Sequence, residues 1–180
     1  MHRYKLLIGS AMLAAVSVLL QIYKIAYPFA GFIDIDAVGV PWIIATFLFG
    51  LFGGVVASIV SAIGIAVFAP TGPVGAAMKF IATIVMVLIV GLIVKKFGYG
   101  KKGLAIAFAL CLAARPAIMV FFNYYIGIPL FFGIPTETAI EQFPVELFII
   151  PNMILAAIDF WIAYLLVFGT RLKERLHADD

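Results

Sequence analysis

The sequence predicts an all-α membrane protein with six transmembrane helices and both termini in the cytoplasm. Of its 180 residues, 66% are hydrophobic and only 12% are charged, about half the charged share of a soluble domain. The apolar residues form runs of about 20, which is the length that crosses the hydrocarbon core of a bilayer. We therefore expect one integral-membrane domain over residues 1–180, surrounded by lipid, in a multi-pass protein of the cell membrane.

The first helix is expected where basic residues precede the first apolar run. This run extends from Leu6 towards Tyr27, which is long for a signal peptide, and no convincing small-residue cleavage site ends it. We therefore interpret it as a retained helix.

Proline and glycine separate the remaining runs. The six expected helices cover residues 5–26, 41–51, 55–68, 74–95, 103–128 and 146–169. Pro41 suits the first turn of the second helix, where its missing N–H would have no partner in any case. Gly50, Gly53 and Gly54 predict a tight turn before the third helix, and the sequence Ala-Pro-Thr-Gly-Pro at residues 69–73 predicts the next loop.

The charges predict the orientation. Nine of the twelve Lys and Arg residues lie in three places: Arg3 and Lys5, then Lys95, Lys96, Lys101 and Lys102, and finally Arg171, Lys173 and Arg175. With six crossings these places share one side, which the positive-inside rule assigns to the cytoplasm. Because the basic residues cluster at helix ends, they do not indicate binding to nucleic acid.

The motifs of several enzyme classes are absent. The chain has no GxxxxGK[ST] phosphate loop, no HExxH and no cluster of Cys and His at metal-ligand spacing. The single cysteine, Cys111, lies in an apolar run. We therefore predict no catalytic residue, no metal site and no ATP hydrolysis by this chain alone.

Three ionisable residues lie inside the expected spans: Lys79, Arg115 and Asp159. Each costs about 2.5–3.5 kcal/mol at the centre of a transmembrane helix, so each needs a partner or a function. Lys79 is near the outer end of its helix, where it either reaches the outer interface or contacts a ligand.

The depths of the other two charges are linked by two asparagines. Arg115 lies eight residues before Asn123 on an outward helix, and Asp159 lies seven residues after Asn152 on an inward helix. At 1.5 Å per residue these separations are about 12 Å and about 10.5 Å. We therefore expect an intramembrane ion pair between Arg115 and Asp159, either as a structural link or as the floor of a site in which the asparagines meet a ligand.

Short motifs along nearly the whole chain resemble one family. They are Asp36 with Val40-Pro41 and Phe49-Gly50, Pro73-Val74-Gly75 with Phe80-Ile81-Ala82, Asn123-Tyr124, Pro151-Asn152-Met153-Ile154, and Ala11 with Ala15. In their order and spacing they resemble the substrate-binding S components of energy-coupling factor (ECF) transporters, and the riboflavin-specific branch most closely.

The resemblance implies a subunit that captures a vitamin from outside the cell and has no cofactor, with riboflavin as the transported ligand. Its partners would be a coupling membrane subunit and two ABC-type ATPases. Asn123 and Asn152 would bind the flavin ring, with Tyr124 in the same ligand-binding segment. The loop that contains Asp36 would close over the ligand. Ala11 and Ala15 would form the docking face on the first helix.

The sequence also departs from that branch. Leu155 stands where the riboflavin branch has a lysine, and Lys79 stands where it has a small polar residue. Another small heterocyclic vitamin or precursor is therefore an alternative ligand. Alternatives of another class are a small membrane enzyme and an assembly subunit without a ligand.

Overall fold

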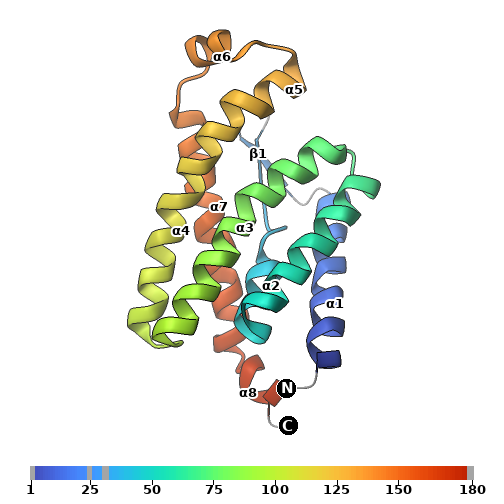
Figure 1. The fold of residues 1–180 in the computed structure, drawn as a ribbon, viewed down its shortest axis with the longest axis vertical. Helices are drawn as coiled ribbons and strands as arrows, with labels where there is room; N and C mark the ends of the chain where they lie inside the picture. The colour runs from blue at the N-terminus through green and yellow to red at the C-terminus, as the bar shows by residue number, and fades with distance from the viewer. Residues whose placement is uncertain (1–2, 24–25, 30–32, 178–180) are drawn as a thin grey trace.

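The computed structural model describes residues 3–23, 26–29 and 33–177 as a helical bundle elongated along one axis (Figure 1). Within these residues, five helices are long and apolar enough to cross a membrane. They are α1 (Arg3–Ile22), α2 (Val40–Phe68), α3 (Gly72–Phe97), Lys101–Phe132 and Glu146–Gly169. The expected helical membrane class is therefore confirmed, but five such helices are found instead of six.

The last two long helices each contain a π-helical turn. Lys101–Phe132 consists of α4 (Lys101–Phe122), the π-helical turn η1 (Asn123–Gly127) and α5 (Ile128–Phe132). Glu146–Gly169 consists of α7 (Glu146–Tyr164) and the π-helical turn η2 (Leu165–Gly169). Such turns accommodate an extra residue, and η1 precedes Pro129, whose ring cannot continue an ordinary hydrogen-bonded turn.

Two short helices and a small sheet complete the fold. The helices are α6 (Thr136–Gln142) and α8 (Leu172–His177), and the strands β1 (Ala26–Phe29) and β2 (Ile33–Asp36) pair antiparallel. The sheet adds two strands of four residues each to the predicted helical fold. The first helix, expected to reach residue 26, ends at Ile22, and residues 24–25 lie outside the described part.

α2 (Val40–Phe68) begins inside the bundle and first runs towards the end that holds both termini (Figure 1). Contacts with α1 show in which direction α2 runs. Ser17 Oγ donates a hydrogen bond of 2.7 Å to the Val38 carbonyl just before α2 begins. Further along α2, the Phe49 ring packs against Gly9, about two turns earlier in α1.

The chain then reverses at Gly50, whose φ of 76° and ψ of −172° are non-helical. After the reversal, Gly53 lies beside Ser10, and Gly64 lies beside Val18. Residues 40–49 and 51–68 of α2 are therefore two helical arms that run in opposite directions on either side of Gly50. The tight turn expected over residues 50–54 is confined to Gly50, because the second arm restarts at once.

The reversal leaves helical carbonyls without their usual partners. The Phe47 carbonyl accepts a hydrogen bond from the Tyr99 hydroxyl and another from Lys173 Nζ, both of 3.1 Å. The Lys173 ammonium also lies 3.0 Å from the centre of the Tyr99 ring. Tyr99, in the turn between α3 and α4, and Lys173 of α8 thus together cap the end of the first arm.

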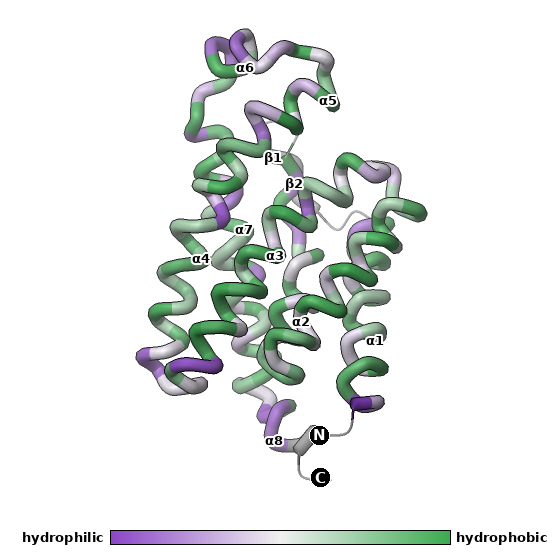
Figure 2. The backbone as a smooth tube through the Cα atoms, viewed as in Figure 1, coloured by the Kyte–Doolittle hydropathy of each residue, from purple (hydrophilic) through white to green (hydrophobic). Residues whose placement is uncertain are grey.

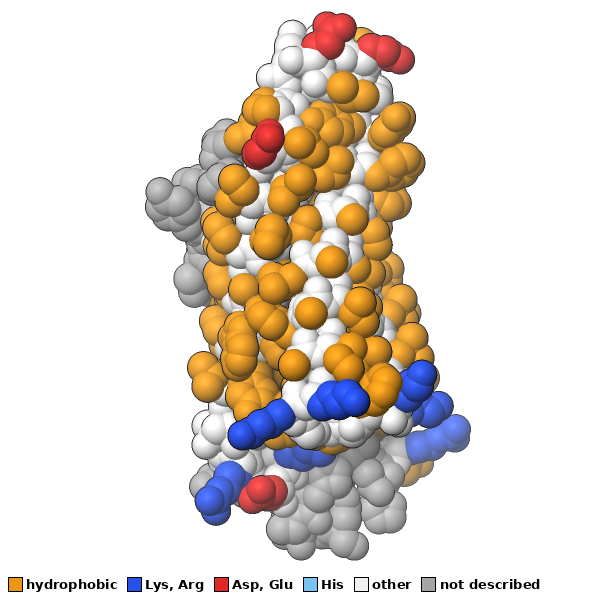
Figure 3. Space-filling view, turned by 90° about the vertical axis from the view of Figure 1, so that its left-hand side faces the viewer, with side chains coloured by type: hydrophobic (Ala, Val, Ile, Leu, Met, Phe, Trp, Pro, Cys, Tyr) orange, Lys and Arg blue, Asp and Glu red, His pale blue; other side chains and the backbone are white. Residues whose placement is uncertain are grey.

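Apolar and charged residues divide the surface along the long axis. Figure 2 shows hydrophobic sequence along the helices and hydrophilic sequence mainly at the two ends. In Figure 3, Lys and Arg side chains gather at the end of the termini, below a broad apolar belt, and most acidic side chains of this face lie near the opposite end. We call the end with the termini the basic end.

Candidate functional site

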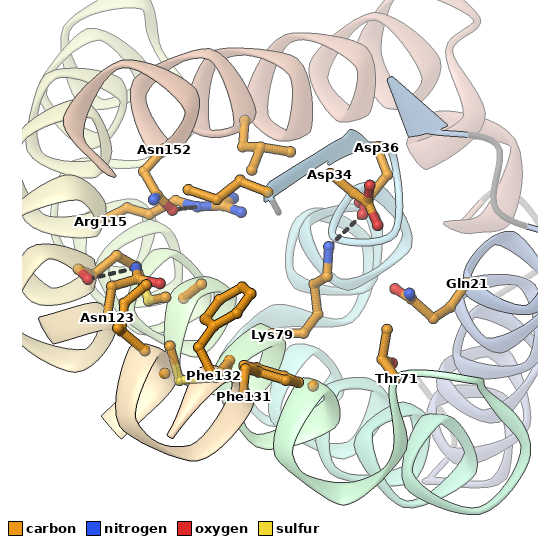
Figure 4. Close-up of a pocket in the computed structure, with 18 residues that line it drawn as sticks. Gln21, Asp34, Asp36, Thr71, Lys79, Arg115, Asn123, Phe131, Phe132 and Asn152 are labelled. Atoms are coloured by element: carbon orange, nitrogen blue, oxygen red, sulfur yellow. Dashed lines mark hydrogen bonds and ion pairs between the residues drawn. The ribbon is translucent and has the colours of Figure 1, made fainter. Parts of the chain in front are cut away.

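A cavity of about 420 Å³ lies in the half of the bundle opposite the basic end, between α1, β2, α3, α4, α5 and α7 (Figure 4). Its volume falls within the range of about 300–1,000 Å³ that is typical of small-molecule sites. Five of the residues expected to bind a ligand line it, namely Asp36, Lys79, Asn123, Asn152 and Leu155, and so does Arg115 of the expected ion pair.

Lys79 and Asp36 form one polar part of the wall. Lys79 Nζ makes a short ion pair with Asp36 Oδ2, while Asp36 Oδ1 accepts a hydrogen bond of 3.0 Å from the Val38 N–H. The Lys79 side chain lines the cavity, where its ammonium group meets Asp36 (Figure 4). The pair fastens the end of β2 to α3.

Arg115 forms the second polar part with residues of α7. Its Nη1 lies 2.6 Å from Asp159 Oδ2, and its Nε donates a hydrogen bond of 3.3 Å to Asn152 Oδ1. Asn152 Nδ2 donates a further bond of 2.9 Å to the Phe148 carbonyl. Asn152 is therefore not left entirely for a ligand, because it shares the guanidinium with Asp159.

The Asp159 carboxylate also faces the buried start of α2. A Cβ on Gly39, the residue before the helix, would lie 2.6 Å from Asp159 Cγ and 2.9 Å from Oδ1. Only glycine leaves room for the carboxylate there, although the backbone at Gly39 is ordinary, with φ −76° and ψ −20°. The positive end of the helix dipole and Arg115 together compensate the charge of Asp159.

The two neighbours in η1 have different surroundings. Asn123 lines the cavity, and its Nδ2 donates a hydrogen bond of 2.7 Å to the Met119 carbonyl, which leaves Oδ1 directed into the cavity (Figure 4). Tyr124 is buried and does not line the cavity. Its hydroxyl donates a hydrogen bond of 2.6 Å to the Phe143 carbonyl, and its ring packs edge-on against Phe148. Tyr124 therefore supports the site from behind.

The cavity contains further residues that the sequence analysis did not single out as site residues. They include Gln21, Asp34, Thr71, Met78 and Phe132. Gln21 is the clearest omission, because its Oε1 is buried without a hydrogen-bond partner among the described residues. A polar residue near the end of a long apolar run was the only signal available for it.

Ala11 and Ala15 lie away from the cavity. Both are exposed, because α1 turns its other face, with Ser10, Ala14 and Ser17, towards the bundle. This leaves a lipid-facing surface with small side chains on α1.

The described residues contain no group of three or more His, Cys, Asp and Glu arranged to hold a metal ion. The fold and the cavity together define a membrane-embedded protein with room for a small molecule in its interior.

Comparison with known proteins identifies the class more closely. The sequence profile of the ECF transporter substrate-specific component matches residues 5–170, and the chain belongs to this family. A solved structure, described as the structure and mechanism of the S component of a bacterial ECF transporter, is similar with a TM-score of 0.79 and 25% identity. The similarity covers 98% of this chain and 99% of that chain. A search of curated proteins found no match.

Membership confirms the expected membrane class and transport role. The chain is a substrate-capture subunit of a transporter and not an enzyme, and S components work with an ECF membrane subunit and ATPases. The residues that line the cavity determine which substrates it can bind.

Proposed function

We propose that the chain captures a vitamin from outside the cell in this cavity, and that riboflavin is the first candidate. The observation that carries the proposal is the division of the cavity into two chemically different ends (Figure 4). Riboflavin has the same division, with a flat apolar ring system at one end and a polyhydroxylated chain at the other.

The end between α4, α5 and α7 suits the ring. Leu155 and Met119 supply apolar surface, and the half-exposed Phe131 and Phe132 supply aromatic faces. Asn123 adds a polar group that can orient the ring edge, as the resemblance to the riboflavin branch implies. Arg115 and Asn152 lie at the same end, so a ring there would meet apolar surface together with a small set of polar side chains, as is typical of small-molecule sites.

The end near α1 suits the hydroxylated chain. Gln21 and Thr71 line it together with Asp34. Hydroxyl groups both donate and accept hydrogen bonds, so they can pair with the buried Gln21 Oε1 and with the carboxylate.

The charges support an orientation. Both termini and the Lys-rich turn between α3 and α4 lie at the basic end, which the positive-inside rule assigns to the cytoplasm (Figure 1). The cavity then lies in the outer half of the membrane. If each arm of α2 counts as one crossing, the chain crosses six times.

The test is to purify the chain in detergent, record its visible absorbance, and titrate it with riboflavin while following flavin fluorescence. Asn123→Ala is expected to weaken binding by about 1–3 kcal/mol, because it removes a buried polar contact. Tyr125→Phe, in the same π-helical turn, is the control and should bind normally, since Tyr125 is exposed and does not line the cavity. Saturable binding that is equal in both variants would remove Asn123 from the site.

A second candidate is another small heterocyclic vitamin or precursor. The observation that favours it is Leu155, which lies in the cavity wall where the riboflavin branch has a lysine. Absence of flavin binding, together with thermal stabilisation by a different vitamin, would establish this alternative. Stabilisation by no vitamin would favour an assembly subunit.

We also propose that Ala11 and Ala15 dock the coupling membrane subunit, since both are exposed and small. Replacing both with leucine should abolish uptake in a strain that carries the complete transporter, while ligand binding by the purified subunit stays normal. Ile8→Leu, an exposed position on the same helix, is the control. Normal uptake by the double variant would contradict this role.

A further inference from the structure

We propose that Arg115 determines specificity by donating hydrogen bonds from Nη2 to a carbonyl oxygen of an uncharged ligand. The inference rests on the proposed function, since it assigns the chemistry of the ligand at the same cavity. It makes Arg115 a ligand-recognition residue in addition to a partner of Asp159.

The first observation is the unused part of the guanidinium. Nε donates to Asn152, and Nη1 donates to Asp159 and, over 3.4 Å, to Met86 Sδ. Nη2, with two further N–H groups, has no partner among the described residues. Yet the Arg115 side chain is only 2% exposed. Nη2 itself is not fully buried, because it borders the cavity that Arg115 lines, and an acceptor on a ligand there can pair with it.

The second observation is the direction of the side chain. Arg115 extends from α4 into the cavity, and Asn152 and Asp159 hold its other nitrogens (Figure 4). These contacts fix the plane of the guanidinium before a ligand arrives. Such preorganisation lowers the cost of binding and makes the direction of the acceptor specific.

The third observation is the charge around the cavity. Lys79 and Arg115 are both paired, with Asp36 and Asp159 respectively, and Asp34 adds another carboxylate to the lining. Three carboxylates thus accompany two cations. An anionic ligand would meet an excess of negative charge, which is costly in an interior of low dielectric constant. An uncharged carbonyl uses the donors of Nη2 without that cost.

The experiment compares riboflavin with 2-thioriboflavin and 4-thioriboflavin, in which sulfur replaces one carbonyl oxygen and accepts hydrogen bonds weakly. Wild-type protein should bind one thio analogue at least about tenfold more weakly than riboflavin. The double variant Arg115→Met/Asp159→Leu removes both charges together, an exchange that buried ion pairs often tolerate. It should bind riboflavin about ten- to hundred-fold more weakly and lose the discrimination between oxygen and sulfur.

A folded double variant that keeps both affinity and discrimination would overturn the inference and leave the ion pair with a purely structural role. If the double variant does not fold, Arg115→Lys replaces it, because lysine retains the charge beside Asp159 but has no Nη2. This variant should lose the same discrimination, and its retention would also overturn the inference.

A second set of binding measurements tests the inference independently of riboflavin. It compares two amides with the corresponding carboxylates: nicotinamide with nicotinate, and biotinamide with biotin. If riboflavin does not bind but an amide binds better than its carboxylate, the riboflavin proposal fails and the inference stands. Preference for a carboxylate overturns the inference and leaves vitamin capture intact. Binding of no probe overturns both.

Discussion

Gly39→Ala should be one of the most damaging single-methyl additions in the protein. The backbone at Gly39, with φ −76° and ψ −20°, accepts alanine without strain. The added Cβ would nevertheless lie 2.6 Å from Asp159 Cγ, closer than real Cβ contacts occur. The cost must therefore come from displacement of the Asp159 carboxylate.

The size of the stability loss expected for Gly39→Ala follows from the ion pair between Arg115 and Asp159. Arg115 and Asp159 are each 1% exposed, and their charged atoms are 2.6 Å apart. Separating a buried pair of this kind costs about 3–5 kcal/mol, because each charge is left without compensation. If the Asp159 carboxylate moves but keeps part of its contact with Arg115, the loss of stability should lie near the lower end of this range.

The assay is unfolding of the purified protein in mixed micelles, followed by circular dichroism. Gly169→Ala is the control, since a Cβ there meets nothing within 4 Å, and its stability should stay within about 0.5 kcal/mol of wild type. Gly39→Ala in an Arg115→Met/Asp159→Ala background should cost much less than in wild type, because no side-chain atom beyond Cβ then remains at position 159 for the new Cβ to meet. Equal loss in both backgrounds, or no loss in wild type, would refute the electrostatic explanation.

Two other predictions concern residues outside the cavity. Tyr124→Phe should reduce stability by about 0.5–1.5 kcal/mol, measured by the same unfolding assay, because it removes the 2.6 Å hydrogen bond to the Phe143 carbonyl; unchanged stability would contradict this. Burial lowers the pKa of Lys173 from 10.5 to about 8, so the folded state binds fewer protons than the unfolded chain between these values. Stability should therefore rise with pH through this window, and unfolding measured from about pH 7.5 to about pH 10 should show a smaller rise in Lys173→Met. An equal rise in the variant would exclude Lys173 as its source.

The features that depend on local sequence were the most predictable. Apolar runs and their proline and glycine breaks located the long helices, because backbone groups in a bilayer must bond within their own segment. Comparing residue depths also placed Arg115 and Asp159 at one level, since rise per residue is nearly constant along a helix. The structure has these two side chains in contact.

The features that depend on tertiary contact were not predictable in the same way. Asp36 and Lys79 are 43 residues apart in the sequence. The spacing of apolar residues within each segment does not predict that the end of β2 lies beside α3. The strands themselves are only four residues each, too short for a clear alternating pattern. Asn152 was expected to be available to a ligand, but one guanidinium reaches both it and Asp159.

Hydropathy also could not show that residues 40–49 are shielded from lipid. Every residue of this first arm of α2 is buried, although its sequence is as apolar as a lipid-facing helix. At 1.5 Å per residue the arm is about 15 Å long, half the thickness of the hydrocarbon core. Its place in the membrane therefore depends on α1, α3 and α7 around it.

This dependence has a consequence for biogenesis. A segment of that length is too short to be a stable insertion unit by itself, so the two arms should enter the bilayer as one hairpin with Gly50 at its tip. The polar start of the first arm, beside Gly39, acquires its partner Asp159 only when α7 has been synthesised. Until then the hairpin holds an uncompensated helix terminus within the membrane, and completion of the C-terminal helix is the step that secures it.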